Sequence, residues 1–470
     1  MSDALDEATG QARLGLEFLH AVREDNTDRA VTLVQTHPDL AGLSLRTAAA
    51  AGNLDAVHRH LAANPATATQ AIPPDFTPPL VYAALSDVKR ALGVPVETQV
   101  TIVRALLDAG ANPNSTVPLP DQAGDIPVLY FPSISGNVPV AALLLSRGAN
   151  ATDGESLYHA AQHDRREILS LLATHGADLS RAPDGASASP LYFLAAHRAG
   201  SRLHPTVTSG MQWLLEQGAD PNVPLTTVGA DQRPSQLGEC PLHRLATSGY
   251  GADVIDRFVA HGALVDVARA DGVTPYQLAL RSGNPDAAAA LERAGADASR
   301  ATPLDRLLNA CLRGDEAPAR TLTAAHPSLI VDLDEESAGA LLVAIAEGRQ
   351  AAVAVMLALG WPLDRESEWG GTPLHWAAWH GQEGVVAQLV AHGAPINHRD
   401  RRYGSSPLAW AAHGSRFCDD GPTAAYPRVV EQLLAAGATR AESINRWGEP
   451  PEQLASDDVS RRLKEHGFAQ

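Results

Sequence analysis

A short segment that ends in glycine recurs along this chain, and its spacing restricts the fold more than any other feature. In each copy an apolar run, a glycine or polar break and a second apolar run precede the glycine. Gly262 and Gly295 are 33 residues apart, as are Gly360 and Gly393, and the other intervals range from 28 to 65 residues. A period near 33 with insertions predicts a repeat protein in which each unit packs on its neighbours. The closing glycines are Gly110, Gly148, Gly176, Gly218, Gly262, Gly295, Gly360, Gly393 and Gly437.

The physical chemistry of one copy, residues 372–397, explains why the unit is a pair of helices. Thr372 is a suitable N-cap, and Pro373 fits the first helical position, where its missing N–H costs nothing. Ala377 and Ala378 are small enough to let neighbouring helices approach closely. Gly393 ends the second helix, since a residue without Cβ enters the left-handed conformation freely. One such pair cannot bury its apolar face alone, so the units must stack.

This copy, TPLHWAAWHGQEGVVAQLVAHGAPIN, resembles the ankyrin repeat, and TPxxxxA or SPLxxxA variants recur at Ser189, Thr274, Thr302 and Ser406. The resemblance covers nearly the whole chain. It implies an all-α ankyrin solenoid of helix-turn-helix units with short hairpin fingers, of a bacterial type with about twelve divergent repeats. The units that we expect are 13–40, 41–72, 73–117, 122–152, 153–182, 186–224, 235–267, 270–299, 302–330, 335–365, 368–398 and 402–439, with 445–467 as a C-terminal cap.

Two units have the sequence of an array start. The segments that begin at Leu16 and Leu307 both end in His-Pro-x-Leu, which indicates an internal duplication. We therefore expect a first block over residues 1–300 and a second block with the cap over residues 301–470, stacked continuously on the first. Four insertions depart from the period, and each is either loop drift or an elaborated surface. Three lie between paired helices and one in a hairpin between units: 87–98, 198–210, 414–427 and 223–238.

Charge and composition exclude several classes of function. The chain has 54 acidic and 36 basic side chains, a formal charge of −18, which disfavours nucleic acid or an anionic membrane as partner. No apolar run approaches the length of a membrane span, and the first 20 residues lack the pattern of a signal peptide. Three cysteines lie far apart without CxxC spacing, and no HExxH, GxGxxG or GxxxxGK[ST] motif occurs. We expect a cytoplasmic monomer without cofactor or metal.

The resemblance implies that finger tips and exposed positions of each first helix hold a partner protein. Two tryptophans fall at such positions, and an exposed aromatic cluster is not what a purely structural surface needs. The alternative is that these aromatic residues pack on the insertion 414–427. The partner-binding residues predicted from the motif, with Arg401 from the same finger, are Glu368, Trp369, Trp379, His380, Arg401, Arg402, Tyr403 and His413.

Other residues have mainly structural interpretations. His375 and His243 belong to the motif and should hydrogen-bond within their own hairpins, and Trp376 and Trp410 should line the core or the groove. Cys418 follows His413 by five residues, but the adjacent acids would weaken a thiol nucleophile. The acidic run at residues 331–336 is typical of a solvated hairpin. Cation binding by these carboxylates is the less favoured alternative.

The sequence therefore favours a binding scaffold that recognises another protein through its concave face, without catalytic residues. Two alternatives remain open. One is an enzyme that acts on a small molecule or peptide in a groove roofed by the insertions, and the other is an inhibitory or immunity protein that blocks a basic partner. An open face would favour a protein partner, and a closed pocket with convergent polar groups would favour catalysis. If the protein is an enzyme, its groove candidates are Glu347, Trp369, Trp379, His380 and His413.

Overall fold

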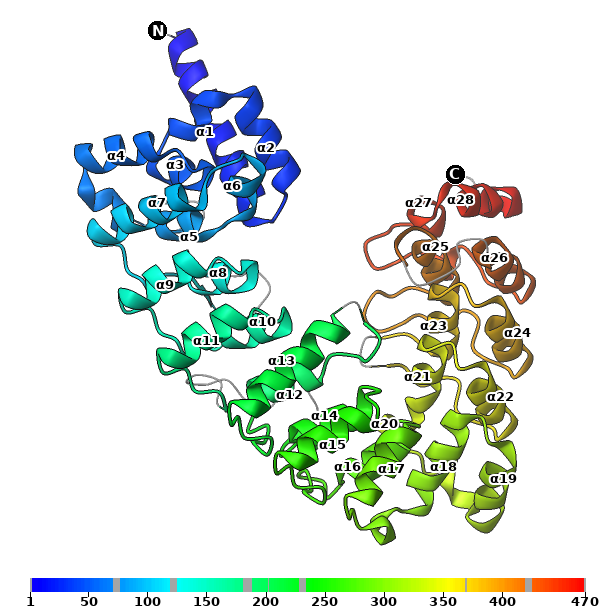
Figure 1. The fold of residues 1–470 in the computed structure, drawn as a ribbon. Helices are drawn as coiled ribbons and strands as arrows, with labels where there is room; N and C mark the ends of the chain where they lie inside the picture. Colours follow the sequence, from blue (N-terminus) through cyan, green and yellow to red (C-terminus); the bar gives the residue numbers. More distant parts are fainter. Residues whose placement is uncertain are drawn as a thin grey trace. The chain divides into compact units, whose positions relative to one another are not determined.

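The computed structural model of the chain confirms the predicted all-α class. The described residues are 2–70, 77–118, 125–180, 188–201, 203–227, 234–367, 370–418 and 425–468, with side chains from residue 10 onward. Helices follow one another in pairs along them (Figure 1), and the strands found there are β1 (Thr116–Pro118) and β2 (Asp125–Pro127), which pair antiparallel. None of the described helices has both the length and the apolar character that a bilayer crossing requires.

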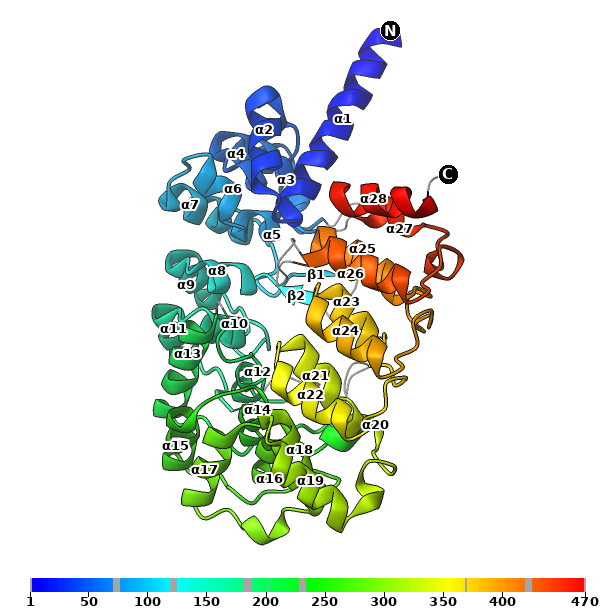
Figure 2. The ribbon, with the colours of Figure 1, turned by 90° about the vertical axis from the view of Figure 1, so that its right-hand side faces the viewer.

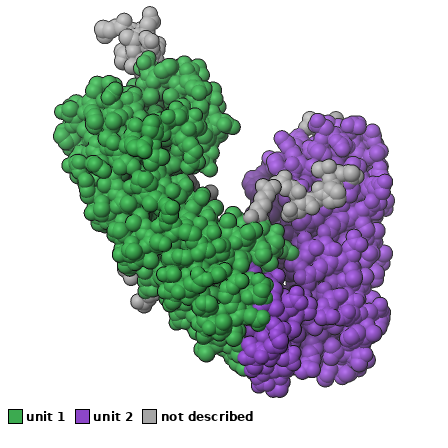
Figure 3. Space-filling model, in the orientation of Figure 1, with its two compact units in different colours: residues 1–248, 253–272 green, residues 249–252, 273–470 purple. Residues whose placement is uncertain are grey.

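The chain divides into two compact units, which Figure 3 shows in different colours. Unit 1 comprises residues 1–248 and 253–272, and unit 2 comprises residues 249–252 and 273–470. This division falls one repeat before residue 301, where the second block was expected to begin. The division into blocks 1–300 and 301–470 stays a prediction, and so does their continuous stacking.

Each of the twelve expected units contains a pair of consecutive helices, and the expected cap contains α27 and α28. The α-helices of unit 1, whose last helix has its first residue in unit 2, are α1 (Ser2–Arg23), α2 (Thr27–Thr36), α3 (Leu45–Ala51), α4 (Leu54–Ala63), α5 (Pro79–Ala84), α6 (Asp87–Ala91), α7 (Val96–Asp108), α8 (Tyr130–Ser135), α9 (Val138–Ser146), α10 (Ser156–Gln162), α11 (Arg166–Thr174), α12 (Pro190–Ala195), α13 (His204–Glu216), α14 (Pro241–Thr247) and α15 (Ala252–Ala260).

In unit 2 the first helices of successive pairs pack on one another, and the second helices form a parallel row (Figures 1 and 2). Thus α21 contacts α23 and α23 contacts α25, while α22, α24 and α26 follow beside them. The α-helices of unit 2 are α16 (Pro275–Arg281), α17 (Pro285–Arg293), α18 (Pro303–Arg313), α19 (Glu316–Ala325), α20 (Glu335–Ala338), α21 (Ala340–Ala346), α22 (Gln350–Ala358), α23 (Pro373–Trp379), α24 (Glu383–Ala391), α25 (Pro407–Phe417), α26 (Tyr426–Ala435), α27 (Pro451–Leu454) and α28 (Asp457–Leu463).

The ends of the helices lie where the sequence predicts them. Helix α23 begins at Pro373 directly after Thr372, and Gly393, two residues after α24 ends, has a φ of +83°. At α18, the backbone N–H of Asp305 donates to the Thr302 hydroxyl (3.1 Å), while the Asp305 carboxylate accepts from the Thr302 N–H (2.8 Å). This reciprocal pair satisfies two of the N–H groups that a helix start leaves unbonded.

An asparagine four residues after a closing glycine ties one repeat to the next. The Asn397 side chain donates to the Gly437 carbonyl (2.8 Å) and accepts from the Thr439 N–H (3.1 Å). Asn114 and Asn222 make the same two bonds, to the turns that contain Gly148 and Gly262. The segments GANPN, GADPN and GAPIN therefore carry a bridge between neighbouring turns, which the sequence analysis did not identify.

Three of the four expected loop insertions are partly helical, which corrects the sequence-based interpretation. Residues 204–210 belong to α13, because Val207 and Met211 are buried in the core. Residues 414–417 form the last turn of α25, and Gly414 permits this, since a Cβ there would lie 2.3 Å from the Trp379 carbonyl oxygen. Residues 71–76, 119–124, 181–187, 202, 228–233, 368–369 and 419–424 lie outside the described residues.

The insertion at residues 87–98 contains the helix α6 because Lys89 folds inward. Lys89 is 1% exposed, and its Nζ donates to the carbonyls of Tyr82 (2.7 Å) and Leu85 (2.7 Å) at the end of α5. Burial lowers the pKa of Lys89 to about 7, against a smaller raising effect of Asp87. The amine thus satisfies two carbonyls that the end of α5 would otherwise leave unbonded.

We predict that Lys89→Met lowers the free energy of unfolding by about 2 kcal/mol, because two buried carbonyls lose their donor. Urea unfolding followed by circular dichroism measures the change. Lys464→Met is the matched control, since Lys464 is exposed and should tolerate the change. A Lys89→Met protein as stable as wild type would mean that the two hydrogen bonds only offset the cost of burying the amine.

The two expected array starts have the same local structure, which supports the duplication. His37 and His326 both end a helix in the same conformation (φ −130°, ψ 76° and φ −134°, ψ 74°), and a short 3₁₀ turn follows each. In the C-terminal block, one cluster of buried apolar side chains extends from Leu307 to Phe468. These residues supply a core within the block itself.

We propose that residues 301–470 fold without the rest of the chain. Because repeat stability is approximately a sum of unit and nearest-neighbour terms, this fragment should stay helical and unfold cooperatively, at a lower urea concentration than the same segment in the intact protein. A cut after Gly381, inside a repeat, should cause aggregation. An unfolded 301–470 fragment, with a single transition in the intact protein, would contradict the proposal.

Candidate functional site: an aromatic pocket

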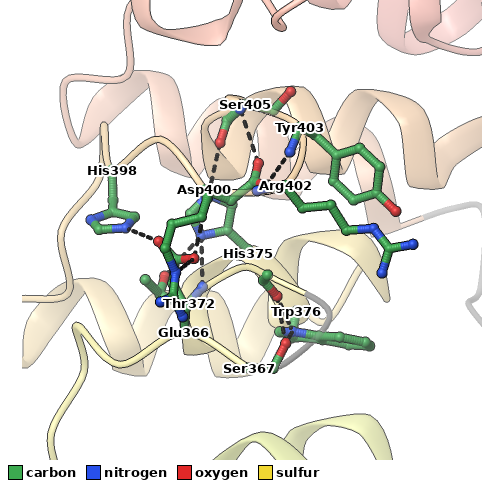
Figure 4. Close-up of polar contacts among 12 residues, drawn as sticks. Glu366, Ser367, Thr372, His375, Trp376, His398, Asp400, Arg402, Tyr403 and Ser405 are labelled. Carbon is green, nitrogen blue, oxygen red and sulfur yellow. Dashed lines mark hydrogen bonds and ion pairs between the residues drawn. The ribbon is translucent and has the colours of Figure 1, made fainter. Parts of the chain in front are cut away.

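The finger between α24 and α25 is shaped by one buried carboxylate (Figure 4). Asp400 is 2% exposed and accepts hydrogen bonds from the backbone N–H groups of Arg402 (2.9 Å), Tyr403 (2.6 Å) and Ser405 (2.9 Å). It also accepts from the indole N–H of Trp410 (3.1 Å). The sequence folds this way locally because an aspartate side chain readily bonds backbone N–H groups that follow it in a turn.

A second carboxylate connects this finger to the preceding one. Glu366 accepts from His398 Nε2 (2.7 Å) and from the backbone N–H and Nε of Arg401 (3.1 and 3.0 Å). Burial alone would raise the pKa of Glu366, but the bonds from His398 and Arg401 lower it below its ordinary value. The guanidinium of Arg401 is therefore engaged, although most of the side chain is exposed.

His375 joins the start of α23 to the following finger, which extends the predicted role within its own hairpin. Its Nδ1 accepts from the Thr372 N–H (3.0 Å), and its Nε2 donates to the Ser405 carbonyl (3.0 Å). Burial lowers the pKa of His375 to about 4, although the Ser405 carbonyl and Asp400 favour the charged form. The imidazole is thus neutral near pH 7, with its proton on Nε2.

These fingers and helices surround a pocket of about 480 Å³ in unit 2. Among its lining residues, Trp410 packs edge to face against three other rings, with centroid distances of 5.8 Å to Trp376, 6.1 Å to Trp379 and 5.9 Å to Tyr403. The described residues that line this aromatic pocket are Trp376, Trp379, Tyr403, Ser405, Ala409, Trp410, His413, Asn445, Trp447, Glu449 and Leu454.

The finger of the C-terminal cap forms one wall of the aromatic pocket. Asn445 accepts from the backbone N–H groups of Trp447 (3.0 Å) and Glu449 (2.9 Å), and its amide donates to the Glu449 carboxylate (2.7 Å). The Arg446 N–H donates to the Tyr403 carbonyl (2.9 Å), which joins this finger to the preceding one. Trp447 is 64% exposed, and its ring centroid lies 6.3 Å from that of Tyr403.

Three titratable side chains line the aromatic pocket: Tyr403, His413 and Glu449. Burial lowers the pKa of His413, while Glu449 raises it by a smaller amount. His413 is therefore mainly neutral at pH 7, and its ring packs against Trp379 at 5.5 Å. Glu449 is the acidic side chain among the described lining residues.

The structure brings together three of the predicted partner-binding residues, since Trp379, Tyr403 and His413 line the aromatic pocket. His380 ends α23, stacks on Trp376 at 6.0 Å and lies outside the described lining, as do Arg401 and Arg402. Glu347 pairs with Arg349 at the end of α21 and is also outside the lining. Glu368 and Trp369 lie outside the described residues.

The contact between Cys418 Sγ and His380 Nδ1 (3.7 Å) was not anticipated from the sequence. Sequence reasoning also missed Trp447 and Glu449, which belong to the cap. One signal could have located them: the segment NRWGE, residues 445–449, has an asparagine and a glycine at finger positions. Trp376 and Trp410 line the aromatic pocket, as expected of groove residues.

Unit 1 contains a second group of aromatic and histidine side chains, on α8, α10 and α12. The Tyr158 hydroxyl contacts His197 Nε2 (2.9 Å), and the Tyr158 ring packs against His159 and Phe193. Burial raises the pKa of Tyr158 to about 12. The described residues of both units contain no group of three or more His, Cys, Asp and Glu side chains placed to hold a metal ion.

Comparison with known proteins identifies the repeat. Residues 307–400 and 341–439 match the family model described as ankyrin repeats in three copies. A curated relative, ankyrin repeat domain-containing protein SAT10 from Stachybotrys chartarum (strain CBS 109288 / IBT 7711), is 31% identical over 130 residues. That match spans 27% of this chain and 6% of the relative. Among solved structures, the human ASB11 ankyrin repeat domain is 20% identical and covers 60% of this chain and 99% of its own length, with a TM-score of 0.29.

The buried His375 generates a prediction about pH. The unfolded chain binds a proton at this histidine below pH 6.5, whereas the folded protein does so only near pH 4. His375 therefore contributes stability that is complete above pH 6.5 and is lost as the pH falls to about 4, by up to about 3 kcal/mol. Urea unfolding of His375→Gln should show a smaller loss over this range than wild type. His392→Gln, which changes an exposed histidine, should keep the wild-type slope, and an unchanged slope in His375→Gln would refute the prediction.

Proposed function

Because this chain is an ankyrin-repeat protein, we propose that it is a binding scaffold that recognises a partner protein through the concave face of its C-terminal repeats. The aromatic pocket is the observation that carries this proposal. Ankyrin repeats are generally protein-interaction modules, and the fingers and first helices that bind partners in such repeats are the elements that form this pocket.

The aromatic side chains at this site are more exposed than the fold requires. Trp447 and Tyr403 are 64% and 37% exposed, and Phe417 next to His413 is also exposed. Large aromatic residues that converge on a concave surface are typical anchors of protein interfaces, because a partner can bury much apolar area on rigid rings. Three adjacent repeat elements contribute these rings, so the anchor points keep fixed relative positions within unit 2.

The chemistry of the aromatic pocket supports binding over catalysis. Its lining is mainly apolar, and its titratable side chains within the described residues are Tyr403, His413 and Glu449. Cys418 and His380 contact one another outside this lining. A nucleophile with a base inside a closed cleft would support an enzyme, and the described lining has no such pair.

We further propose that the protein acts as a monomer in the cytoplasm and does not bind nucleic acid. The excess of acidic side chains disfavours a phosphate backbone as ligand. Its three cysteines are free thiols, and two of them are buried, which is usual in a reducing compartment.

Trp379→Ala should weaken partner binding by about 2 kcal/mol or more, as loss of an interface anchor does. Trp379 is partly exposed, so the free energy of unfolding should fall by much less than the about 3 to 5 kcal/mol typical of a core tryptophan. Affinity capture from the native cell with wild-type bait, followed by titration of the recovered partner, measures the change. His392→Ala, on the outer helix of the same repeat, is the control that should bind normally.

Two outcomes would contradict this assignment. Equal recovery and equal affinity with Trp379→Ala would place the interface elsewhere. Unfolding of the variant with the loss expected of a core residue would make Trp379 structural, and Trp447→Ala would then test the pocket, since that side chain is largely exposed.

A further inference from the structure

We propose that the aromatic pocket binds a weakly hydrated cation of the partner protein, a guanidinium or a methylated ammonium group, between its ring faces and the carboxylate of Glu449. This inference rests on the proposed function and names the chemistry of the group that the scaffold recognises. The argument depends on which parts of the rings face the pocket, on the charge of the lining and on the cost of removing water from the ligand.

The indole rings of the aromatic pocket have their polar edges engaged by the protein. The Trp410 N–H donates to Asp400 (3.1 Å), and the Trp376 N–H lies 3.2 Å from both the Ser367 hydroxyl and the Gly370 carbonyl. Figure 4 shows the contact between the Trp376 indole and Ser367. With the N–H edges tied in this way, the two rings offer the pocket π surface. The face of an aromatic ring is the negative end of its quadrupole and attracts cations within about 6 Å.

The charge of the lining has the sign that a cation requires. Glu449 is exposed at the rim, and its carboxylate is bonded by the neutral amide of Asn445 (2.7 Å). Among the described residues no basic side chain pairs with this carboxylate. His413 is mainly neutral because burial lowers its pKa, so it adds no positive charge near pH 7. The described lining therefore contains one acidic side chain and no lysine or arginine, in keeping with the charge of −18 of the whole chain.

The protein's own arginines already use the rings in this way. The guanidinium of Arg402 lies 5.6 Å from the centroid of Tyr403, and that of Arg446 lies 5.9 Å from the centroid of Trp447. Neither arginine belongs to the described lining. The geometry shows that rings of this site accept a planar cation at the distance expected for a cation–π contact.

Desolvation selects the type of cation. An unmodified lysine ammonium is compact and strongly hydrated, whereas a guanidinium is weakly hydrated and stacks on aromatic faces. Methylation also reduces the hydrogen bonds that an ammonium makes with water, and aromatic sites recognise such groups. A lining with many rings and few acceptors cannot replace the water around a bare ammonium. The pocket of about 480 Å³ has room for either of the two weakly hydrated groups.

The experiment compares ligands of equal shape and different charge. Choline and its neutral isostere 3,3-dimethyl-1-butanol are titrated into the full-length protein, together with N-acetyl-arginine amide, and tryptophan fluorescence is followed. The probe reports on the site because four of the seven tryptophans line the aromatic pocket. At least one of the two cations should bind about fivefold or more tightly than the neutral alcohol. Choline binding assigns a methylated ammonium, and arginine binding assigns a guanidinium.

Glu449→Gln should weaken cation binding about three- to tenfold and leave the neutral alcohol unaffected, because it removes the charge and keeps the shape. Glu442→Gln is the matched control, since Glu442 is an exposed acid outside the pocket lining and should change neither. Trp447→Ala should weaken cation binding while circular dichroism stays unchanged.

Equal binding of choline, arginine amide and the alcohol would show that the pocket recognises apolar volume, and would overturn the inference. Absence of saturable binding by both cations would overturn it as well. Either result leaves the partner-capture test with Trp379→Ala intact, so failure of the cation assignment is distinguishable from failure of the proposed scaffold function.

Discussion

The hydrogen bonds of the buried Asp400 carboxylate hold the aromatic pocket in place. The Asp400 side chain holds the finger through the backbone N–H groups of Arg402, Tyr403 and Ser405. It also holds the indole N–H of Trp410, a residue that lines the pocket. This carboxylate can stay buried because four donors surround it, which offsets the loss of water. Both the position of the Tyr403 ring and the direction of the Trp410 ring therefore depend on it. The site is preorganised, so a partner need not order this finger when it binds.

The bonds between fingers extend this order along unit 2. Ser405 is shared, because its N–H donates to Asp400 and its carbonyl accepts from His375 of the preceding repeat. Glu366 and Asn397 make further bonds from one repeat to the next. Each bond lies within or near a turn, where buried backbone groups need partners that helices cannot supply. Adjacent fingers thus form one connected surface, although each repeat is only a pair of short helices.

The sequence predicted what depends on short-range pattern. The period near 33 residues, the cap at Thr372 and the exposed positions of Trp379 and Tyr403 follow from rules that apply within one repeat. Long-range choices could not be predicted in this way. Residues 87–98 read as a loop because nothing local shows that Lys89 will reach carbonyls at Tyr82 and Leu85. Cys418 contacts His380, which is 38 residues away in sequence. Proximity in sequence is a poor guide where two helices of different repeats pack together.

The C-terminal cap shows why stability and recognition are linked in such a protein. An array of repeats needs a last element that buries the exposed end of its core, and here Val459, Leu463 and Phe468 do so. A segment selected only for this role would be polar on its outer side. This cap instead contributes Trp447 and Glu449 to the aromatic pocket, with Asn445 ordering its turn much as Asp400 orders the preceding one. Without the cap, the pocket would lose its carboxylate and one ring, and the core would lose its cover. The same residues therefore have to satisfy both constraints.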